Sequence, residues 1–171
     1  MDVEKWDEVK DKINSIKFEF KNGDDLKVYE ALGLSESDVD LLDSLSEIFK
    51  KDNIVDIADV VCEDIHDTKM LTVIALSLAG RRIVNGLRLH DAIIIGTSDP
   101  IDMANIYGVD PSVIPDIVNI DTSTNSSIEA ILEYDKLYEK YDRKTVFASL
   151  YIYYEFMAIR EILFKHLGVL N

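Results

Sequence analysis

The most apolar stretch of the chain, residues 68–96, repeats one stripe of positions at alternating spacings of three and four. The stripe consists of Val73, Leu76, Gly80, Ile83, Leu87, His90 and Ile94. This spacing places the positions along one face of an α-helix. We therefore expect one central apolar helix over about 68–95, with Gly80 at a close contact with another helix. Thr68 is expected to cap its start and Gly96 to end it in a left-handed conformation.

A second strongly apolar helix is predicted at the end of the chain, over about 143–167. Its main face is apolar, and Tyr153, Phe156 and Ile159 lie off that face. A helix that is hydrophobic nearly all round is normally buried on all sides. We expect either a second copy of the chain, in a homo-oligomer, or the acidic N-terminal helices of the same chain to cover it.

Ahead of the central helix, the same periodicity predicts amphipathic helices over 2–21, 24–32 and 35–51. A further helix follows Asn53, which can cap it, and carries Ile54, Ile57, Ala58, Val61 and Ile65 on one face. The prediction for this half of the chain is therefore helical throughout.

Between the two apolar helices, Asp99-Pro100 and Asp110-Pro111 each combine an N-cap residue with a proline at the first helical position. We expect Gly108 to end the first short helix and Pro115 to limit the second. The Ser, Thr and Asn content of 117–125 predicts a loop, and Ser126 or Ser127 is expected to start the next helix.

The composition fits one folded domain. A chain of 171 residues can bury its own core, and a hydrophobic content of 47% argues against disorder. No apolar run reaches the roughly 18 residues that span a membrane. The one cysteine, Cys62, cannot form an internal disulfide, which is typical of the cytoplasm. We predict an all-α, single-domain multi-helix bundle over residues 1–171 that is cytoplasmic and not bound to membranes.

The charge is strongly acidic and unevenly distributed. The formal net charge is -15, and residues 96–135 hold 8 acidic residues and no basic one. The spacing of Ala104, Gly108 and Ile117 is compatible with a helix-turn-helix. However, no Lys or Arg occurs from residue 89 to residue 135, so this segment would approach DNA phosphates against electrostatic repulsion. We predict that the chain does not bind nucleic acid.

Two His-Asp pairs, His66-Asp67 and His90-Asp91, are followed by Asp135 within Tyr-Asp-Lys-Leu. This order resembles that of the HD-domain phosphohydrolases, all-helical enzymes that hydrolyse phosphate esters with a bound metal. The resemblance implies that His66, His90, Asp91 and Asp135 would hold a divalent metal. That metal would polarise the phosphate and activate water.

The predicted central helix opposes this metal site. On one continuous helix, His66 and His90 would stand about 36 Å apart, whereas metal ligands lie about 2 Å from a shared ion. The two histidines meet only if the chain reverses near residues 78–82. The sequence therefore predicts no catalytic residue, no metal and no cofactor. Our first hypothesis is a non-enzymatic helical domain that self-associates or binds a partner protein, and the alternative is a metal-dependent phosphohydrolase.

Three smaller features have plain structural explanations. Glu63-x-x-His66 has the spacing of half a di-iron site, but the chain contains no second Glu-x-x-His. Arg81, Arg82 and Arg88 can grip an anionic ligand or pair with acids on neighbouring helices. We expect them to pair with acids, and we expect the lone cysteine to be a small core residue.

Overall fold

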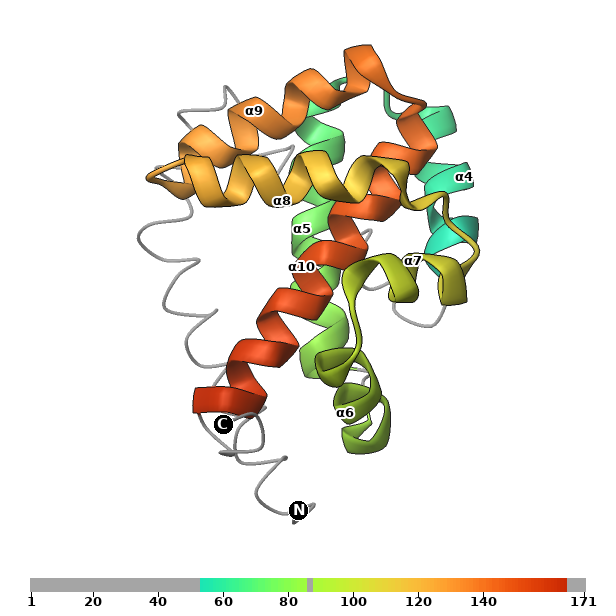
Figure 1. Cartoon of the computed structure of the whole chain (residues 1–171). Helices are drawn as coiled ribbons and strands as arrows, with labels where there is room; N and C mark the ends of the chain where they lie inside the picture. The colour runs from blue at the N-terminus through green and yellow to red at the C-terminus, as the bar shows by residue number, and fades with distance from the viewer. Residues whose placement is uncertain (1–52, 86–87, 166–171) are drawn as a thin grey trace.

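The structure is a computed structural model that describes residues 53–85 and 88–165. The described chain is helical, which confirms the predicted all-α fold (Figure 1). The helices predicted over 2–21, 24–32 and 35–51 lie outside the described residues. The described elements are α4 (Ile54–Asp64), α5 (Thr68–Asn85), α6 (Leu89–Thr97), α7 (Pro100–Tyr107), the 3-10 helix η1 (Pro111–Val113), α8 (Ile114–Ser123), α9 (Ser127–Lys140) and α10 (Arg143–Lys165).

Helix α10 lies at the centre of the bundle and crosses it obliquely, with α5 behind it and α8 across its upper half (Figure 1). It contacts each of the other elements from α4 to α9. Eight consecutive residues of α10, 146–153, are all buried. Because successive residues of an α-helix point about 100° apart, this part of α10 is covered on every side. Helices α4 to α9 of the same chain contribute to this cover.

The central helix predicted over 68–95 is divided into two. Helix α5 ends at Asn85, Arg88 has an extended backbone with φ -82° and ψ 154°, and α6 begins at Leu89. The prediction of one continuous helix was therefore wrong. The spacing of three and four continues across the break because α5 and α6 both pack against α10, so each needs an apolar face. The signal for the break is the Asn85-Gly86 dipeptide, which favours a turn.

The cap of α5 also differs from the prediction. The carboxylate of Asp67 accepts a hydrogen bond from the backbone N–H of Lys69 at 3.0 Å. Thr68 is the first helical residue, and its carbonyl accepts a bond from the Thr72 hydroxyl at 2.9 Å. The acidic half of the first His-Asp pair thus caps a helix, as Asp at this position commonly does.

Three other helix starts are as predicted. The side chains of Asn53, Asp99 and Ser126 each accept a backbone N–H from the first turn of α4, α7 and α9, respectively. Gly108 ends α7 with a φ of 78°, in the left-handed region where a residue without a Cβ is favoured. These predictions are confirmed. They could be made from the sequence because a helix cap depends on only a few neighbouring residues.

The second short helical turn is η1, which Asp110 caps and which ends at Val113, before Pro115, as predicted. Helix α8 follows it, with Pro115 in its first turn, where a missing N–H breaks no helical hydrogen bond. The helix then continues to Ser123, through most of the segment 117–125 that was predicted to be a loop. Ile117 is fully buried and Ile120 packs against the core. Their burial outweighs the low helix propensity of the polar residues.

Gly96 lies inside α6, where α6 closely approaches α10, and does not end the helix in a left-handed conformation. A Cβ at this position would overlap the Leu163 side chain and lie 3.2 Å from Cγ2 of Ile159. Both α10 side chains are fully buried and cannot move into solvent. The structure does not describe the surroundings of Gly80, where the sequence predicted a close helix–helix contact. A close contact of this kind occurs instead at Gly96.

We expect Gly96→Leu to lower the free energy of unfolding by about 1–3 kcal/mol, because the new side chain must displace buried atoms of α10. Thr97→Leu, at the exposed neighbouring position, is the control and should change it by less than about 0.5 kcal/mol. Urea denaturation of both variants measures the difference. Equal stabilities would show that α6 and α10 do not approach closely at Gly96.

None of the helices within residues 53–85 and 88–165 has the length and hydropathy of a membrane-spanning segment. The prediction of a single domain over 1–171 stays a prediction, since the first 52 residues are not described.

Candidate functional site

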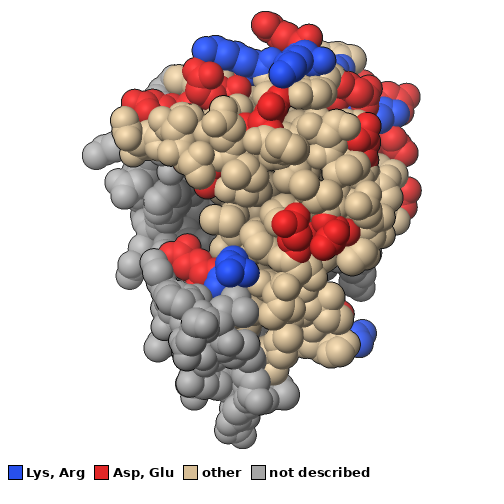
Figure 2. Space-filling view, viewed as in Figure 1, with Lys and Arg blue, Asp and Glu red and all other residues tan. Residues whose placement is uncertain are grey.

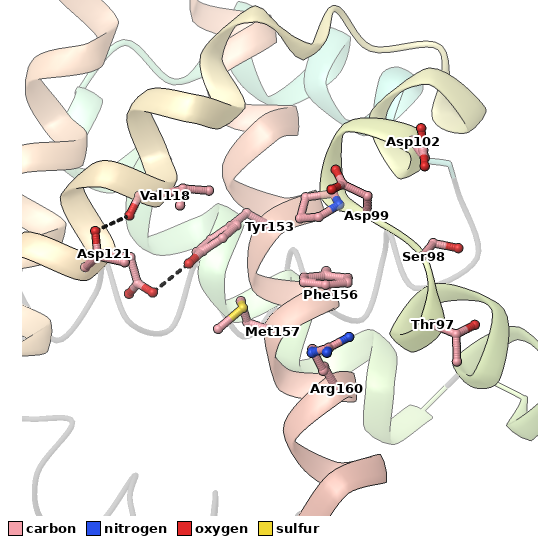
Figure 3. Close-up of a pocket in the computed structure, with 12 residues that line it drawn as sticks. Thr97, Ser98, Asp99, Asp102, Val118, Asp121, Tyr153, Phe156, Met157 and Arg160 are labelled. Carbon is pink, nitrogen blue, oxygen red and sulfur yellow. Dashed lines mark hydrogen bonds between the residues drawn. The ribbon is translucent and has the colours of Figure 1, made fainter. Parts of the chain in front are cut away.

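A groove of about 710 Å³ opens beside α10 (Figure 3). Tyr153, Phe156, Met157 and Arg160 of α10 contribute to its lining and form its floor. Tyr153 and Phe156 are buried and fixed by the core beneath them, whereas 40% of the Met157 surface is exposed. The floor is therefore largely apolar, with one movable thioether side chain at its surface.

The two walls of the groove come from separate parts of the chain. Helix α8 supplies Val118 and Asp121 on one side, and the start of α7 supplies Asp99 and Asp102 on the other (Figure 3). Val118 is 38% exposed. The walls thus combine an apolar contact with three carboxylates.

A hydrogen bond fixes α8 against α10 at one edge of the groove. The Tyr153 hydroxyl donates to Oδ2 of Asp121 at 2.6 Å. Burial of the ring, together with the hydrogen bond to Asp121, raises the pKa of Tyr153 above its usual range. The proton therefore stays on the phenol, which donates its hydrogen bond to the carboxylate.

A second tyrosine holds the other end of α8. The Tyr141 hydroxyl donates to Oδ2 of Asp116 at 2.5 Å, and Nζ of Lys140 donates to the same oxygen at 3.1 Å. These two hydrogen bonds lower the pKa of Asp116. Helix α8 is part of a segment with no basic residue, so its carboxylates are bonded by side chains from α9 and α10. The sequence reasoning missed these bonds, whose only signal was an excess of acids beside a tyrosine-rich C-terminal helix.

Arg160 closes the groove at the end near α6. Its Nη1 donates to the carbonyl oxygen of Gly96 at 3.2 Å, and its guanidinium lies 5.9 Å from the centroid of the Phe156 ring. A cation near the last carbonyls of a helix is favoured by the helix dipole. Arg160 thus connects α10 to the end of α6 and leaves the rest of its exposed guanidinium free to meet a ligand.

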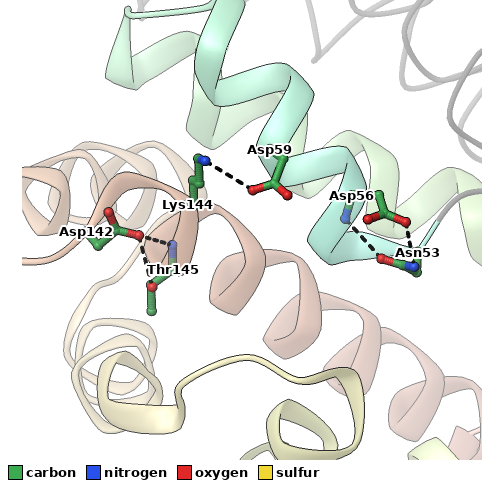
Figure 4. A network of polar contacts seen from close by, with 6 residues as sticks. All are labelled: Asn53, Asp56, Asp59, Asp142, Lys144 and Thr145. Atoms are coloured by element: carbon green, nitrogen blue, oxygen red, sulfur yellow. Dashed lines mark hydrogen bonds and ion pairs between the residues drawn. The ribbon is translucent and has the colours of Figure 1, made fainter.

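The opposite end of α10 carries a separate polar network. Lys144 Nζ lies 3.1 Å from Oδ1 of Asp59 on α4, and Asp142 caps α10 by accepting from the N–H and hydroxyl of Thr145 (Figure 4). Both charged groups of the ion pair are about half exposed, so it contributes little to stability. The ion pair connects α4 to the start of α10 without contributing much to their packing.

Arg143 belongs to the same end and contacts the first predicted metal ligand. Its Nη1 lies 3.2 Å from Nδ1 of His66, and its Nη2 donates to the carbonyl of Ile65. His66 is thus near the start of α10, whereas Asp135 lies on α9.

The second His-Asp pair is elsewhere. His90 and Asp91 are exposed in the first turn of α6, beyond the far end of α5 from His66. Helix α5 has 18 residues and is about 27 Å long. Within the two described ranges, no group of three His, Cys, Asp or Glu side chains is close enough to hold a metal ion. The structure therefore does not bring together the four residues that the resemblance implied.

The other residues singled out in the sequence, Glu63, Cys62 and the three arginines, form no site among the described residues. Glu63 is exposed on α4, and His66 lies after the end of that helix, so the two do not share a helical face. Cys62 is buried, and burial raises the pKa of its thiol to about 11, as expected of an unreactive core residue. Arg88 is exposed, and the side chains of Arg81 and Arg82 lie outside the described part of the structure.

The turn between α7 and α8 is packed as its apolar spacing predicts. Ala104, Val109, Ile114 and Ile117 are all buried around it. Pro115 lies in the first turn of α8. The exclusion of nucleic acid remains a prediction, based on the charge of the segment.

The groove thus combines exposed apolar side chains with fixed polar groups. It has the size of a ligand-binding cleft but is open along its length, as a site for a protein segment would be. The sequence matches no protein-family model, and no curated protein or solved structure is significantly similar to the chain.

Proposed function

We propose that this chain is a non-enzymatic helical domain that binds a partner protein through the groove beside α10. The observation that carries the proposal is the pair of exposed apolar side chains in the groove, Val118 at 38% and Met157 at 40%. Exposed apolar side chains that gather in a concave site are typical of interaction surfaces.

The floor of the groove supports the same function. Protein interfaces are enriched in aromatic residues, Met and Arg, and the floor is made of Tyr153, Phe156, Met157 and Arg160. The Tyr153 and Phe156 rings are already buried and held in place by their neighbours in the folded chain. They therefore lose little conformational freedom when a partner binds. Met157 can adjust its shape to the partner.

Self-association through α10 is the second form of this proposal. Among the described residues of α10, Met157 is the exposed large hydrophobic side chain, so a second copy would have to meet α10 at the groove. Two copies with a net charge of -15 repel each other. For this reason we favour a different protein as the partner.

Selection from a library of displayed random peptides tests the groove directly. We expect peptides whose affinity falls at least about tenfold in Met157→Lys, because a charged side chain would be buried on the floor at a cost of at least about 1.4 kcal/mol. Fluorescence anisotropy of each labelled peptide with the full chain measures the affinity.

Leu132→Lys is the matched control, since Leu132 is 39% exposed on α9 and does not line the groove. It should leave the affinity unchanged, and both variants should unfold at the urea concentration of the parent chain. If no peptide is selected, or if the two variants weaken binding equally, the groove is not the binding site.

A further inference from the structure

The rim of the groove is acidic on both sides. Asp99 and Asp102 lie at the start of α7, and Asp121 faces them from α8 (Figure 3). In the space-filling view, acidic side chains gather over α7 beside a largely uncharged surface (Figure 2). A partner that fits this surface must satisfy an apolar floor and an acidic rim together.

We propose that the segment bound in the groove is a cationic amphipathic helix. Its apolar residues would enter the floor, and Lys or Arg residues on its flanks would meet the three aspartates. This inference rests on the proposed function of the same groove. It adds that the partner is positively charged, which the exposed apolar side chains alone do not indicate.

The rim carboxylates keep acceptor sites for such a partner. Asp99 uses Oδ1 to cap α7, with the N–H of Ile101 at 2.7 Å, and Asp121 uses Oδ2 to accept from Tyr153. A carboxylate has two oxygens and about four acceptor positions. The hydrogen bonds fix the direction of each group and leave room for an ammonium or a guanidinium.

Among the described residues that line the groove, Arg160 is the one basic side chain, and it lies at one end. Its bond to the Gly96 carbonyl and its position near the Phe156 ring hold it there, away from the aspartates of α7 (Figure 3). The three carboxylates therefore lie at the start of α7 and on α8, apart from this cation. Arg160 at the far end suits the carbonyl end of a bound helix, where the dipole is negative.

The negative charge of residues 89–135 argues against three other ligands of the groove: an acidic peptide, a phosphate group and a second copy of the chain. No Lys or Arg occurs from residue 89 to residue 135, so both walls would repel an acidic peptide or a phosphate group. A second copy of the chain would bring its own acidic surface. A cationic helix binds with charge complementarity, which speeds association and selects against these competitors.

Peptides of about 20 residues, each predicted to form an amphipathic helix, provide the test. A displayed library keeps apolar anchors at helical spacing and varies the flanking positions among Lys, Gln and Glu. We expect Lys to be enriched on the full chain. Affinity should fall about tenfold when Asp99, Asp102 and Asp121 are all replaced by Asn, as expected for the loss of three charge pairs at the rim of the groove. Asn keeps the cap of α7 and can still accept from Tyr153.

The control removes the same number of charges elsewhere. Glu63→Gln, Asp64→Asn and Glu139→Gln alter exposed side chains on α4 and α9 that do not line the groove. The proposal is upheld if the rim variant weakens the Lys peptides and this control does not. Equal weakening by both variants would mean that only the net charge matters, and it would overturn the inference.

The library also separates this inference from the proposed function. If Gln or Glu peptides bind as tightly as Lys peptides and remain sensitive to Met157→Lys, the groove is a docking site but its partner is not cationic. If no peptide is sensitive to Met157→Lys, both the inference and the proposed function are wrong.

Discussion

Replacing Phe147 by Ala is expected to lower the free energy of unfolding by about 3–5 kcal/mol. Phe147 has 0% of its surface exposed and lies in the stretch 146–153, where α10 is buried on every side. The substitution removes a large apolar side chain and leaves a cavity that the surrounding helices cannot fill. Urea denaturation followed by far-ultraviolet circular dichroism measures the loss.

Met157→Ala on the same helix is the control, because Met157 is 40% exposed. It should cost less than about 1 kcal/mol. If Phe147→Ala costs no more than Met157→Ala, this part of α10 is not enclosed by its own chain, and the proposal that a second copy covers it would gain support.

Alkaline unfolding between about pH 10 and pH 12 is the second large effect that we expect. Burial raises the pKa of Tyr154 to about 12, and burial also raises the pKa values of Tyr134, Tyr138 and Tyr153 above their usual range. The ordinary pKa of tyrosine in an unfolded chain is about 10. The folded chain therefore holds these phenolic protons more tightly than the unfolded chain does.

The sign of the effect follows from this difference. Below pH 10 the tyrosines are protonated in both states, and their contribution to stability is complete. As the pH rises from 10 through 12, the unfolded chain loses its protons first, so the free energy of unfolding falls. For Tyr154 alone the loss reaches on the order of 2–3 kcal/mol by pH 12. Cys62, whose pKa burial raises to about 11, acts in the same direction above pH 9.

Tyrosinate absorbance and circular dichroism followed together measure this transition. We expect the buried phenols to ionise in one step that coincides with unfolding, and Tyr154→Phe to move the midpoint to higher pH. The Tyr154 ring packs edge-on against Tyr134 and Tyr153, at 6.4 Å between centroids in each case, and Phe keeps these contacts. Ionisation of all tyrosines near pH 10 without unfolding would contradict the buried cluster.

The sequence was sufficient for features that depend on neighbouring residues. The caps at Asn53, Asp99 and Ser126 and the left-handed Gly108 follow from local hydrogen bonds and backbone preferences. Helical periodicity likewise gave the all-α class. Such signals do not determine which helix packs on which.

The predictions that failed depended on packing between distant segments. The apolar stripe through Asn85 predicted one helix because both α5 and α6 pack against α10, and periodicity does not record a change of direction. Local composition likewise predicted a loop at 117–125, where burial of Ile117 keeps α8 helical.

The groove could not be found from the sequence for a related reason. Asp99 directly precedes α7, Val118 belongs to α8 and Met157 belongs to α10, and only the crossing of these helices makes them neighbours. The absence of basic residues from 89 to 135 was visible in the sequence, but there it indicated only what the segment would repel. The structure places three acidic residues of this segment on the walls of an apolar groove, and this position indicates what the groove would bind.

Hydrogen exchange of the full chain, with and without a selected peptide, tests most directly that the groove beside α10 is the binding site. We predict slower exchange on binding in 97–102, 118–122 and 153–160, with no change in α4, which lies outside the groove. Slower exchange confined to α4, or none in the three groove segments at a saturating peptide concentration, would contradict the account.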